Sequence, residues 1–186
     1  FAQLPILMVG YHVPQTNSPE FYPLQILETI LFTGQSSRLY QRLVDKEQLA
    51  LFVGGGWDWS FDPTLFDFTV RPRAGVDPAK VEQVLYEELD RLQKGGITDQ
   101  ELEKAKNIRT AEFFRSMKTI SGKSNIIGTY EVFLGDYNKL INAATDYAKV
   151  TKEDVQQVAQ KYFTEKNRSV ATLIPEAPPA KAQDKK

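Results

Sequence analysis

Few side chains in this sequence could perform chemistry on a substrate. His12 is the only histidine, and none of the 186 residues is a cysteine. A zinc site would therefore have to combine one imidazole with several carboxylates, an unusual ligand set for zinc. A Ser–His–Asp arrangement would also depend on His12, and the sequence places no serine or aspartate beside it. We interpret His12 as a structural residue at the end of a strand.

Two other patterns that suggest chemistry are weak. The segment "SGKS" (121–124) resembles the end of a phosphate-binding loop, but Met117 stands where that loop needs its first glycine. Carboxylate pairs such as Glu87–Glu88 lie in amphipathic helical patterns, where solvated helix faces explain them. The sequence therefore predicts no catalytic residue, metal ligand or cofactor site in this chain.

The net charge and the apolar runs of the sequence limit the kinds of partner that we expect. The formal net charge is −1, from 23 basic and 24 acidic residues, whereas surfaces that bind nucleic acid or anionic membranes carry a basic excess. No apolar run approaches the ~20 residues of a membrane-spanning helix. We therefore expect neither a nucleic-acid partner nor a membrane span. A chain without cysteine suits the cytoplasm and the periplasm equally, so no compartment is assigned. The chain starts at Phe1 without a targeting segment, and we expect it to be a piece of a longer polypeptide.

The hydrophobic pattern predicts four strands. Residues 4–13 form a nearly unbroken apolar run, typical of a strand buried on both faces. Residues 49–59 and 65–72 read as two strands of a hairpin, the second with alternating apolar and polar positions. Residues 168–174 form a last short strand.

Helices fill the remainder. Ser18 and Pro19 predict a helix start, and Gly34 its end. Ser36 or Ser37 is expected to cap a short second helix. Capping signals predict further helices from Asp77 to Gly95 and from Thr98 onward, and the apolar spacing predicts helices over 126–134, 136–148 and 151–163.

This order predicts an α+β fold. A hairpin implies antiparallel pairing, so we expect a mostly antiparallel sheet of about four or more strands with helices packed on one face. Residues 1–175 are expected to form a single domain. Residues 176–186 lack large apolar side chains and are expected to be a disordered tail.

The triplet Gly54–Gly55–Gly56 lies inside a predicted strand and allows two interpretations. A β-bulge or bend before Trp57 is favoured. Alternatively, the glycines permit close main-chain approach by another chain.

Four segments together resemble one family. They are "SSRLYQRLVDKEQLA" (36–50), "ITDQELEKAKN" (97–107), "VTKEDVQQVAQKYF" (150–163) and "RSVATLIPE" (168–176). Their order and spacing are similar to the C-terminal, metal-free domain of the insulinase, pitrilysin and mitochondrial processing peptidase family of zinc metallopeptidases. The resemblance covers about residues 4–175. Each segment alone marks a cap or a helix start, so the ordered combination carries the resemblance.

The resemblance implies a processing-peptidase-like metallohydrolase fold and a partner. In this family a homologous domain, in the same polypeptide or a second subunit, carries zinc on His-x-x-Glu-His and hydrolyses peptides. The metal-free domain closes over it like half of a clamshell and helps to hold an extended peptide substrate. The chain by itself is then expected to be inactive.

One departure bears on activity. In active members the passage from helix to strand commonly supplies an arginine and, seven residues later, a tyrosine that reach the substrate. Val44 and Leu51 stand at these places, and neither can donate a hydrogen bond to an oxyanion, a contact worth about 2.7–4 kcal/mol in other enzymes. Arg42 lies two residues earlier, roughly 200° away on an α-helix. Arg38 is expected to bind backbone carbonyls near the turn.

Three hypotheses follow. The first is a non-catalytic half of a zinc metalloendopeptidase, with Val44, Leu51 and Gly54–Gly56 on the chamber wall and Ser36, Ser37 and Arg38 as a structural motif. The second is a proteolytically inactive scaffold or partner subunit of the same family. The third is an unrelated hydrolase or binding module, which a structure without such a one-sided sheet would support.

Overall fold

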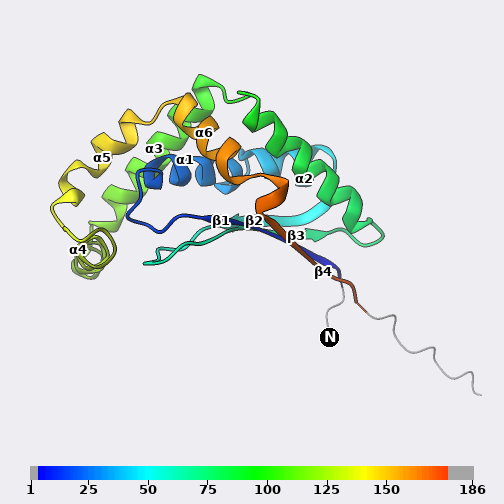
Figure 1. The fold of residues 1–186 in the computed structure, drawn as a ribbon, viewed down its shortest axis with the longest axis horizontal. Helices are drawn as coiled ribbons and strands as arrows, with labels where there is room; N and C mark the ends of the chain where they lie inside the picture. Colours follow the sequence, from blue (N-terminus) through cyan, green and yellow to red (C-terminus); the bar gives the residue numbers. More distant parts are fainter. Residues whose placement is uncertain (1–3, 176–186) are drawn as a thin grey trace, which may run out of the picture.

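The computed structural model describes residues 4–175, and Figure 1 shows them as two layers. The first is a sheet of β1 (Ile6–Val13), β2 (Ala50–Gly56), β3 (Thr64–Pro72) and β4 (Arg168–Leu173). The strand order is β2-β3-β1-β4, and each neighbouring pair is antiparallel. The predicted α+β class is confirmed. The tail predicted at 176–186 lies outside the described residues.

The second layer consists of helices, and in Figure 1 they cover one face of the sheet, as predicted. Most of them begin or end within a few residues of the expected positions. Their bounds are α1 Phe21–Phe32, η1 Tyr40–Lys46, α2 Pro78–Gln93, α3 Asp99–Ser116, α4 Ile120–Leu134, α5 Lys139–Lys149, α6 Lys152–Tyr162 and the short η2 Glu165–Asn167.

Several helix starts are fixed by side-chain caps. The Asp77 carboxylate accepts a hydrogen bond from the amide of Ala79 and begins α2. Thr98 and Glu101 form a full capping box at α3, which confirms the sequence interpretation. Such caps satisfy backbone donors that otherwise lack an intrahelical partner. They therefore fix the residues at which α2 and α3 begin.

The start of α1 differs from the prediction. Ser18 does not cap the helix, because its hydroxyl has no hydrogen-bond partner among the described residues. Ser18 and Pro19 instead lie in a turn, in which the Ser18 carbonyl accepts from the Phe21 amide. The helix therefore begins at Phe21, two residues later than expected.

Strand β1 is buried on one face only, so the prediction of burial on both faces is wrong. Leu7, Val9 and Tyr11 are buried under the helices, whereas Met8 is 49% exposed on the other side. The reason is that no described element covers that second face. We call it the open face of the sheet. An apolar run alone cannot distinguish a central strand of a two-layer fold from one buried in three layers.

Two hydrophobic clusters hold the molecule together. The main core lies between the sheet and helices α1, α2 and α6, and includes Phe66, Phe68 and Leu85. A smaller cluster of Tyr130, Leu134 and Ala143 joins α4 to α5 beside Trp59. Helix α4 is thus attached through a satellite cluster, separate from the main core.

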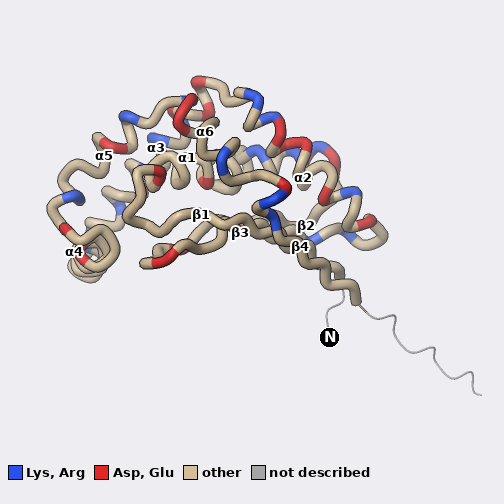
Figure 2. Tube along the Cα trace, in the orientation of Figure 1, with Lys and Arg blue, Asp and Glu red and all other residues tan. Residues whose placement is uncertain are grey.

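Charged residues follow the helical layer. Figure 2 shows acidic and basic positions along the helices, whereas most strand positions are neither. No helix within residues 4–175 is long and apolar enough to cross a bilayer.

Candidate functional site

The passage from α1 to β2 begins with a left-handed turn at Gly34 (φ 76°). The following helix widens after its first residues, because residues 40–46 form a π-helix in which the Glu47 amide donates to the Arg42 carbonyl. Neither predicted cap is formed. Ser36 Oγ accepts from Lys104 Nζ, and Ser37 Oγ has no hydrogen-bond partner in the described chain. Tertiary contacts, rather than a local cap, hold this helix.

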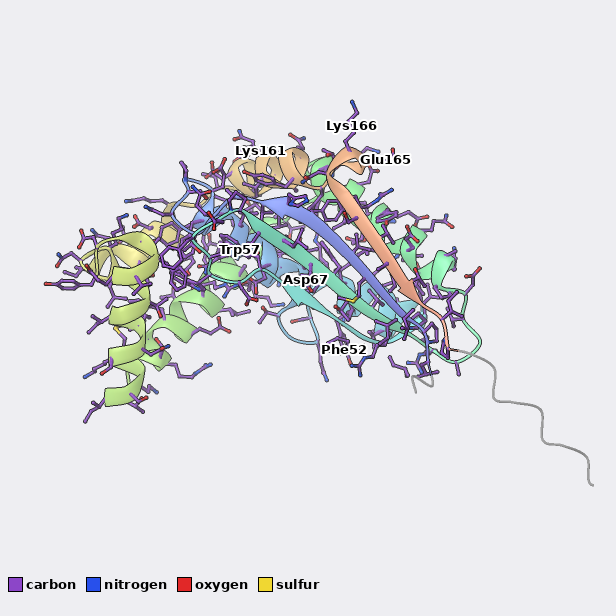
Figure 3. All side chains as sticks on the ribbon, turned by 60° about the horizontal axis from the view of Figure 1, so that its bottom comes forward. Phe52, Trp57, Asp67, Lys161, Glu165 and Lys166 are labelled. Carbon is purple, nitrogen blue, oxygen red and sulfur yellow. The ribbon has the colours of Figure 1, made fainter. Side chains whose placement is uncertain are left out.

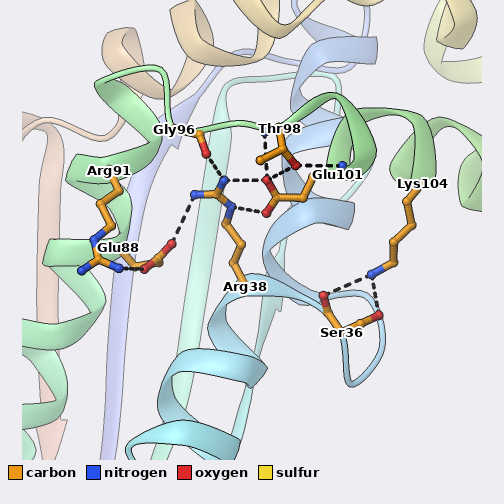
Figure 4. Close-up of polar contacts among 8 residues, drawn as sticks. All are labelled: Ser36, Arg38, Glu88, Arg91, Gly96, Thr98, Glu101 and Lys104. Carbon is orange, nitrogen blue, oxygen red and sulfur yellow. Dashed lines mark hydrogen bonds and ion pairs between the residues drawn. The ribbon is translucent and has the colours of Figure 1, made fainter.

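Arg38 connects three elements, as Figure 4 shows. Its guanidinium donates to both carboxylate oxygens of Glu101, at 2.6 and 2.8 Å, and to Glu88 Oε1 at 3.2 Å. It also donates to the carbonyl of Gly96 in the α2–α3 turn. Burial by itself would raise the pKa of Glu101, but hydrogen bonds from Arg38 and Thr98 outweigh it and lower that pKa. Arg38 therefore joins the start of the passage to α2 and α3, the position expected of a structural residue.

The other end of the passage is fixed by Arg42. Its side chain contacts Glu47 at 2.6 Å and Glu87 of α2 at 3.1 Å. Next, Gln48 adopts φ 51°, a left-handed conformation uncommon for residues other than glycine. This conformation turns the chain from η1 into β2. The Arg42 side chain is thus paired with carboxylates of this same chain.

Val44 and Leu51 lie in different environments. Val44 is partly buried and packs against the main core. Leu51 is 51% exposed, and it occupies the position where the β2–β3 register shifts between Ala50 and Phe52. The β-bulge is therefore at Leu51, and its side chain is available at the surface.

The three glycines do not form the predicted bulge, because their pairing with β3 is regular. A Cβ at Gly55 would lie 2.0 Å from the carbonyl oxygen of Asp67, and one at Gly56 would lie 2.7 Å from Glu28 Oε1. At Gly54 the obstacle is the ring of Phe52, whose tip would be 2.7 Å away. Close approach by this protein's own groups thus explains the triplet.

The register places a mixed row of side chains on the open face. Phe52 lies opposite Arg71, whose guanidinium carbon is 5.6 Å from the ring centroid. Met8 and Leu65, 49% and 43% exposed, add apolar surface from β1 and β3. Figure 3 views the sheet turned by 60°, with Phe52 and Asp67 labelled. The open face is therefore largely apolar, with few charged positions.

Asp67 is the acidic residue of this face. Burial raises the pKa of its carboxyl group, and the negative charge of Asp58 raises it further. Asp67 pairs in register with Gly10 on one side and Gly56 on the other, so both of its cross-strand neighbours lack side chains.

The described residues do not provide a metal site. Among residues 4–175 no group of three or more His, Asp or Glu side chains could hold a metal ion. His12 is exposed at the end of β1, and its carbonyl accepts a hydrogen bond from Asn167. The candidate site is thus the exposed, largely apolar open face of the sheet, and the described residues bring no metal-ligand cluster to it.

Comparison with known proteins decides the family. Residues 2–109 match the family model described as the peptidase M16 inactive domain. The chain belongs to the M16 inactive-domain family. The resemblance to the metal-free domain of this zinc peptidase family is thereby confirmed.

Relatives of this M16 inactive domain include the zinc protease PqqE of Helicobacter pylori, 27% identical over 90% of this chain and 37% of that protein. A crystal structure of a protease from H. pylori superposes with a TM-score of 0.88 at 25% identity, over 94% of this chain and 42% of that one. The inactive peptidase domain of a zinc protease from Bordetella parapertussis gives a TM-score of 0.83 at 26% identity, over 96% and 97%. The chain thus spans 37% of PqqE and 42% of the chain in the H. pylori protease structure, about two fifths in each comparison.

Sequence reasoning predicted helices on one face of the sheet, but it did not identify the residues that the open face of this M16 domain exposes. Phe52, Arg71, Met8 and Leu65 were not predicted as site residues. Alternation of apolar and polar residues in β3 was a signal, because it indicates a sheet covered on one side only. In β1 both faces are apolar, which concealed the same information.

Proposed function

We propose that this chain is the metal-free half of a clamshell zinc metalloendopeptidase. In this proposal it encloses and positions extended peptides while a homologous zinc-bearing domain, in the same polypeptide or a second subunit, hydrolyses them. The observation that carries the proposal is an uncovered, largely apolar sheet face in a member of the M16 inactive-domain family. Apolar surface of this kind usually marks an interaction site.

The open face suits an extended peptide. Phe52, Met8 and Leu65 offer apolar contacts, and Arg71 offers a guanidinium for a peptide carbonyl or carboxylate. The bulge at Leu51 presents a further apolar side chain beside them. Zinc held by the other domain would polarise the peptide carbonyl and activate the attacking water. This chain's contribution would be binding and orientation, and the exclusion of water from the bound peptide.

A second candidate is an inactive scaffold of the same family. Val44 and Leu51 favour it, because neither side chain can donate a hydrogen bond to an oxyanion. Each such donor contributes about 2.7–4 kcal/mol in other enzymes. Residual proteolysis would then be low, and the chain would serve assembly.

The extent of the single domain, residues 1–175, also stays a prediction.

The experiment uses the full-length parent protein. The first observation is whether its sequence, or that of a co-purifying subunit, contains His-x-x-Glu-His. Zinc content and chelator-sensitive cleavage of a peptide library are then measured for Leu65→Glu and for Lys80→Glu, an exposed control on α2. We expect Leu65→Glu to lower kcat/KM by at least about tenfold with zinc retained. Equal activity of both variants would contradict the substrate-facing role.

The same preparation separates the two candidates. Cleavage abolished by chelation and restored by zinc supports the peptidase half. If no peptide is cleaved, the double variant Val44→Arg with Leu51→Tyr tests whether the missing donors are the cause. A gain approaching about 10²-fold would identify them. No gain, in a protein without the zinc motif, would overturn the peptidase proposal.

A further inference from the structure

The two layers of the fold differ in how their charges are neutralised. In the helical layer carboxylates and cations pair with one another, as Glu28 of α1 does with Arg109 of α3 at 3.0 Å. None of the ion pairs within residues 4–175 includes a residue of the four strands. In β4, Arg168 stacks instead on the ring of Tyr86, 3.9 Å from its centroid. The charges of the sheet therefore have no opposite charge from the described chain.

Strand β3 carries two charged residues, Asp67 and Arg71, and both lie on the open face. Successive side chains of a strand point to opposite faces of the sheet. Phe66, Phe68 and Val70 are buried under the helices, so the residues between and after them lie on the other side. Four positions separate Asp67 from Arg71, which is about 13 Å along a strand. The open face thus carries one negative and one positive charge at a fixed spacing.

The surroundings of Asp67 suit a cation. Its cross-strand neighbours, Gly10 and Gly56, have no side chains that could cover the carboxylate. The side chain of Leu65 lies beside Gly10 and offers apolar surface to the stem of a long side chain. The charge of Asp58 repels that of Asp67, and a bound cation would relieve this repulsion. This end of β3 is therefore suited to a lysine or arginine side chain.

The other end of β3 has the opposite character. The guanidinium carbon of Arg71 lies 5.6 Å from the ring centroid of Phe52, and no carboxylate of the described chain pairs with it. Two residues further on, the Nε atom of Arg73 is buried without a hydrogen-bond partner in the same part of the chain. Guanidinium groups bind carboxylates strongly and with defined geometry. This end of β3 therefore suits an acidic group.

The surface between the two charges is uncharged. Thr69 lies midway between them on β3, and its cross-strand neighbours are Met8 on β1 and Gly54 on β2. Met8 is 49% exposed and supplies apolar surface there. In an extended peptide, residues i, i+2 and i+4 share one face and span about 13 Å. The spacing of the two charges therefore matches two side chains of an extended peptide, four residues apart.

On the premise of the proposed function, we propose that the open face selects extended peptides that carry a cationic and an anionic side chain four residues apart. Asp67 contacts the cation and Arg71 the carboxylate, and the residue midway packs on Met8. Charge complementarity of this kind contributes specificity more than affinity. The open face would thus discriminate among peptides by their charge spacing, in addition to binding their apolar side chains.

The test measures peptide binding to the full-length parent protein in the presence of a chelator, so that cleavage does not contribute. The peptides have blocked termini and a neutral coumarin label, and their uncharged residues are threonine, serine and leucine. One set carries lysine and glutamate four residues apart, in either order. The control set has the same composition with the two charges three residues apart, on opposite sides of an extended chain. Fluorescence anisotropy gives Kd for each peptide.

We expect the tighter of the two four-residue peptides to have a Kd at least about fivefold lower than the controls, and the difference to shrink in high salt. Arg71→Glu should reverse the order of affinities, so that a peptide with two lysines binds more tightly than one with lysine and glutamate. Arg115→Glu, the same charge change at an exposed position of α3, should keep the wild-type order. Equal Kd values for the two spacings, or an unchanged order in Arg71→Glu, would overturn the proposal.

A second variant tests the other end. Asp67→Asn keeps the shape of the side chain and removes its charge, and circular dichroism checks that the fold is retained. In this variant, replacing the peptide lysine with glutamine should change Kd by less than about twofold, whereas in the wild type it should raise Kd. An equal effect of that replacement in both proteins would show that Asp67 does not contact the cation and would overturn the proposal.

Failure here is distinguishable from failure of the proposed function. Zinc-dependent cleavage is assayed on the same preparations without chelator. Cleavage without the charge preference would reject this specificity and leave the peptidase half intact. A parent without His-x-x-Glu-His in any subunit would reject the proposed function itself. Light scattering covers the remaining occupant, because a dimer that Arg71→Glu dissociates, with peptide affinities unchanged, would assign the open face to a second copy and overturn the inference.

Discussion

Arg38 offers the sharpest test of how this fold is held together. Its side chain is 11% exposed and that of Glu88 is 8% exposed, so both charges are nearly removed from water. Arg38→Ala would leave Glu88 with only Arg91, at 3.4 Å, among the described residues. It would also remove the two hydrogen bonds to the Glu101 carboxylate and the hydrogen bond to the Gly96 carbonyl. Breaking a buried ion pair by removing one partner costs about 3–5 kcal/mol.

That magnitude predicts a clear experimental result. For a domain of this size each kcal/mol shifts the melting temperature by about 2–4 °C, so Arg38→Ala should lower it by about 6–20 °C. Arg38→Lys should recover only part, because an ammonium group cannot form the bidentate contact with Glu101. Arg115→Ala, at an exposed position on α3, is the matched control and should change stability by less than about 0.5 kcal/mol.

The assays are thermal melting and urea unfolding of the 186-residue chain, both followed by circular dichroism. A double-mutant cycle of Arg38→Ala with Glu88→Gln should show a coupling energy above about 1 kcal/mol, because the two groups are in direct contact. If Arg38→Ala costs less than about 1 kcal/mol, the network in Figure 4 does not hold the passage to α2 and α3, and this reasoning fails.

Three further predictions concern local geometry and pH. Gly55→Ala should destabilise the chain by more than about 2 kcal/mol in urea unfolding, because the added Cβ would lie 2.0 Å from a backbone oxygen. Gly54→Ala should cost less than about 1 kcal/mol, because its Cβ would meet only a ring that can move. Gln48→Gly should stabilise the chain by about 1 kcal/mol in thermal melts, because Gln48 has φ 51° and glycine adopts this conformation without strain. Gln48→Ala should not stabilise the chain, because alanine keeps the same strain. Burial raises the pKa of Glu28 more than Arg109 lowers it. The charged Glu28 therefore costs stability above its folded pKa, and this cost disappears as the pH falls below the ordinary value of 4.5. Glu28→Gln should consequently gain most over the wild type near pH 7, and a constant difference from pH 7 to pH 4 would refute the shift.

Local sequence signals determined much of the secondary structure. The caps at Asp77 and Thr98 act within one helical turn, so residue types and spacing are sufficient to predict them. The hairpin of β2 and β3 followed from turn residues between two apolar segments. Family membership was also legible, because the ordered motifs are themselves local features of helix starts and strands.

Tertiary structure decided which residues lie on the uncovered face of the sheet. Whether β1 is buried on one face or two depends on how many layers surround it, and a run of apolar residues does not carry that number. The reason for the glycines at 55 and 56 became clear only from the positions of Asp67 and Glu28, which are distant in sequence. Ser36 and Ser37 resembled caps, but contacts from Lys104 and Arg38 hold the helix there instead. The open face arises because long-range packing determines exposure, and the sequence pattern records only what each residue prefers.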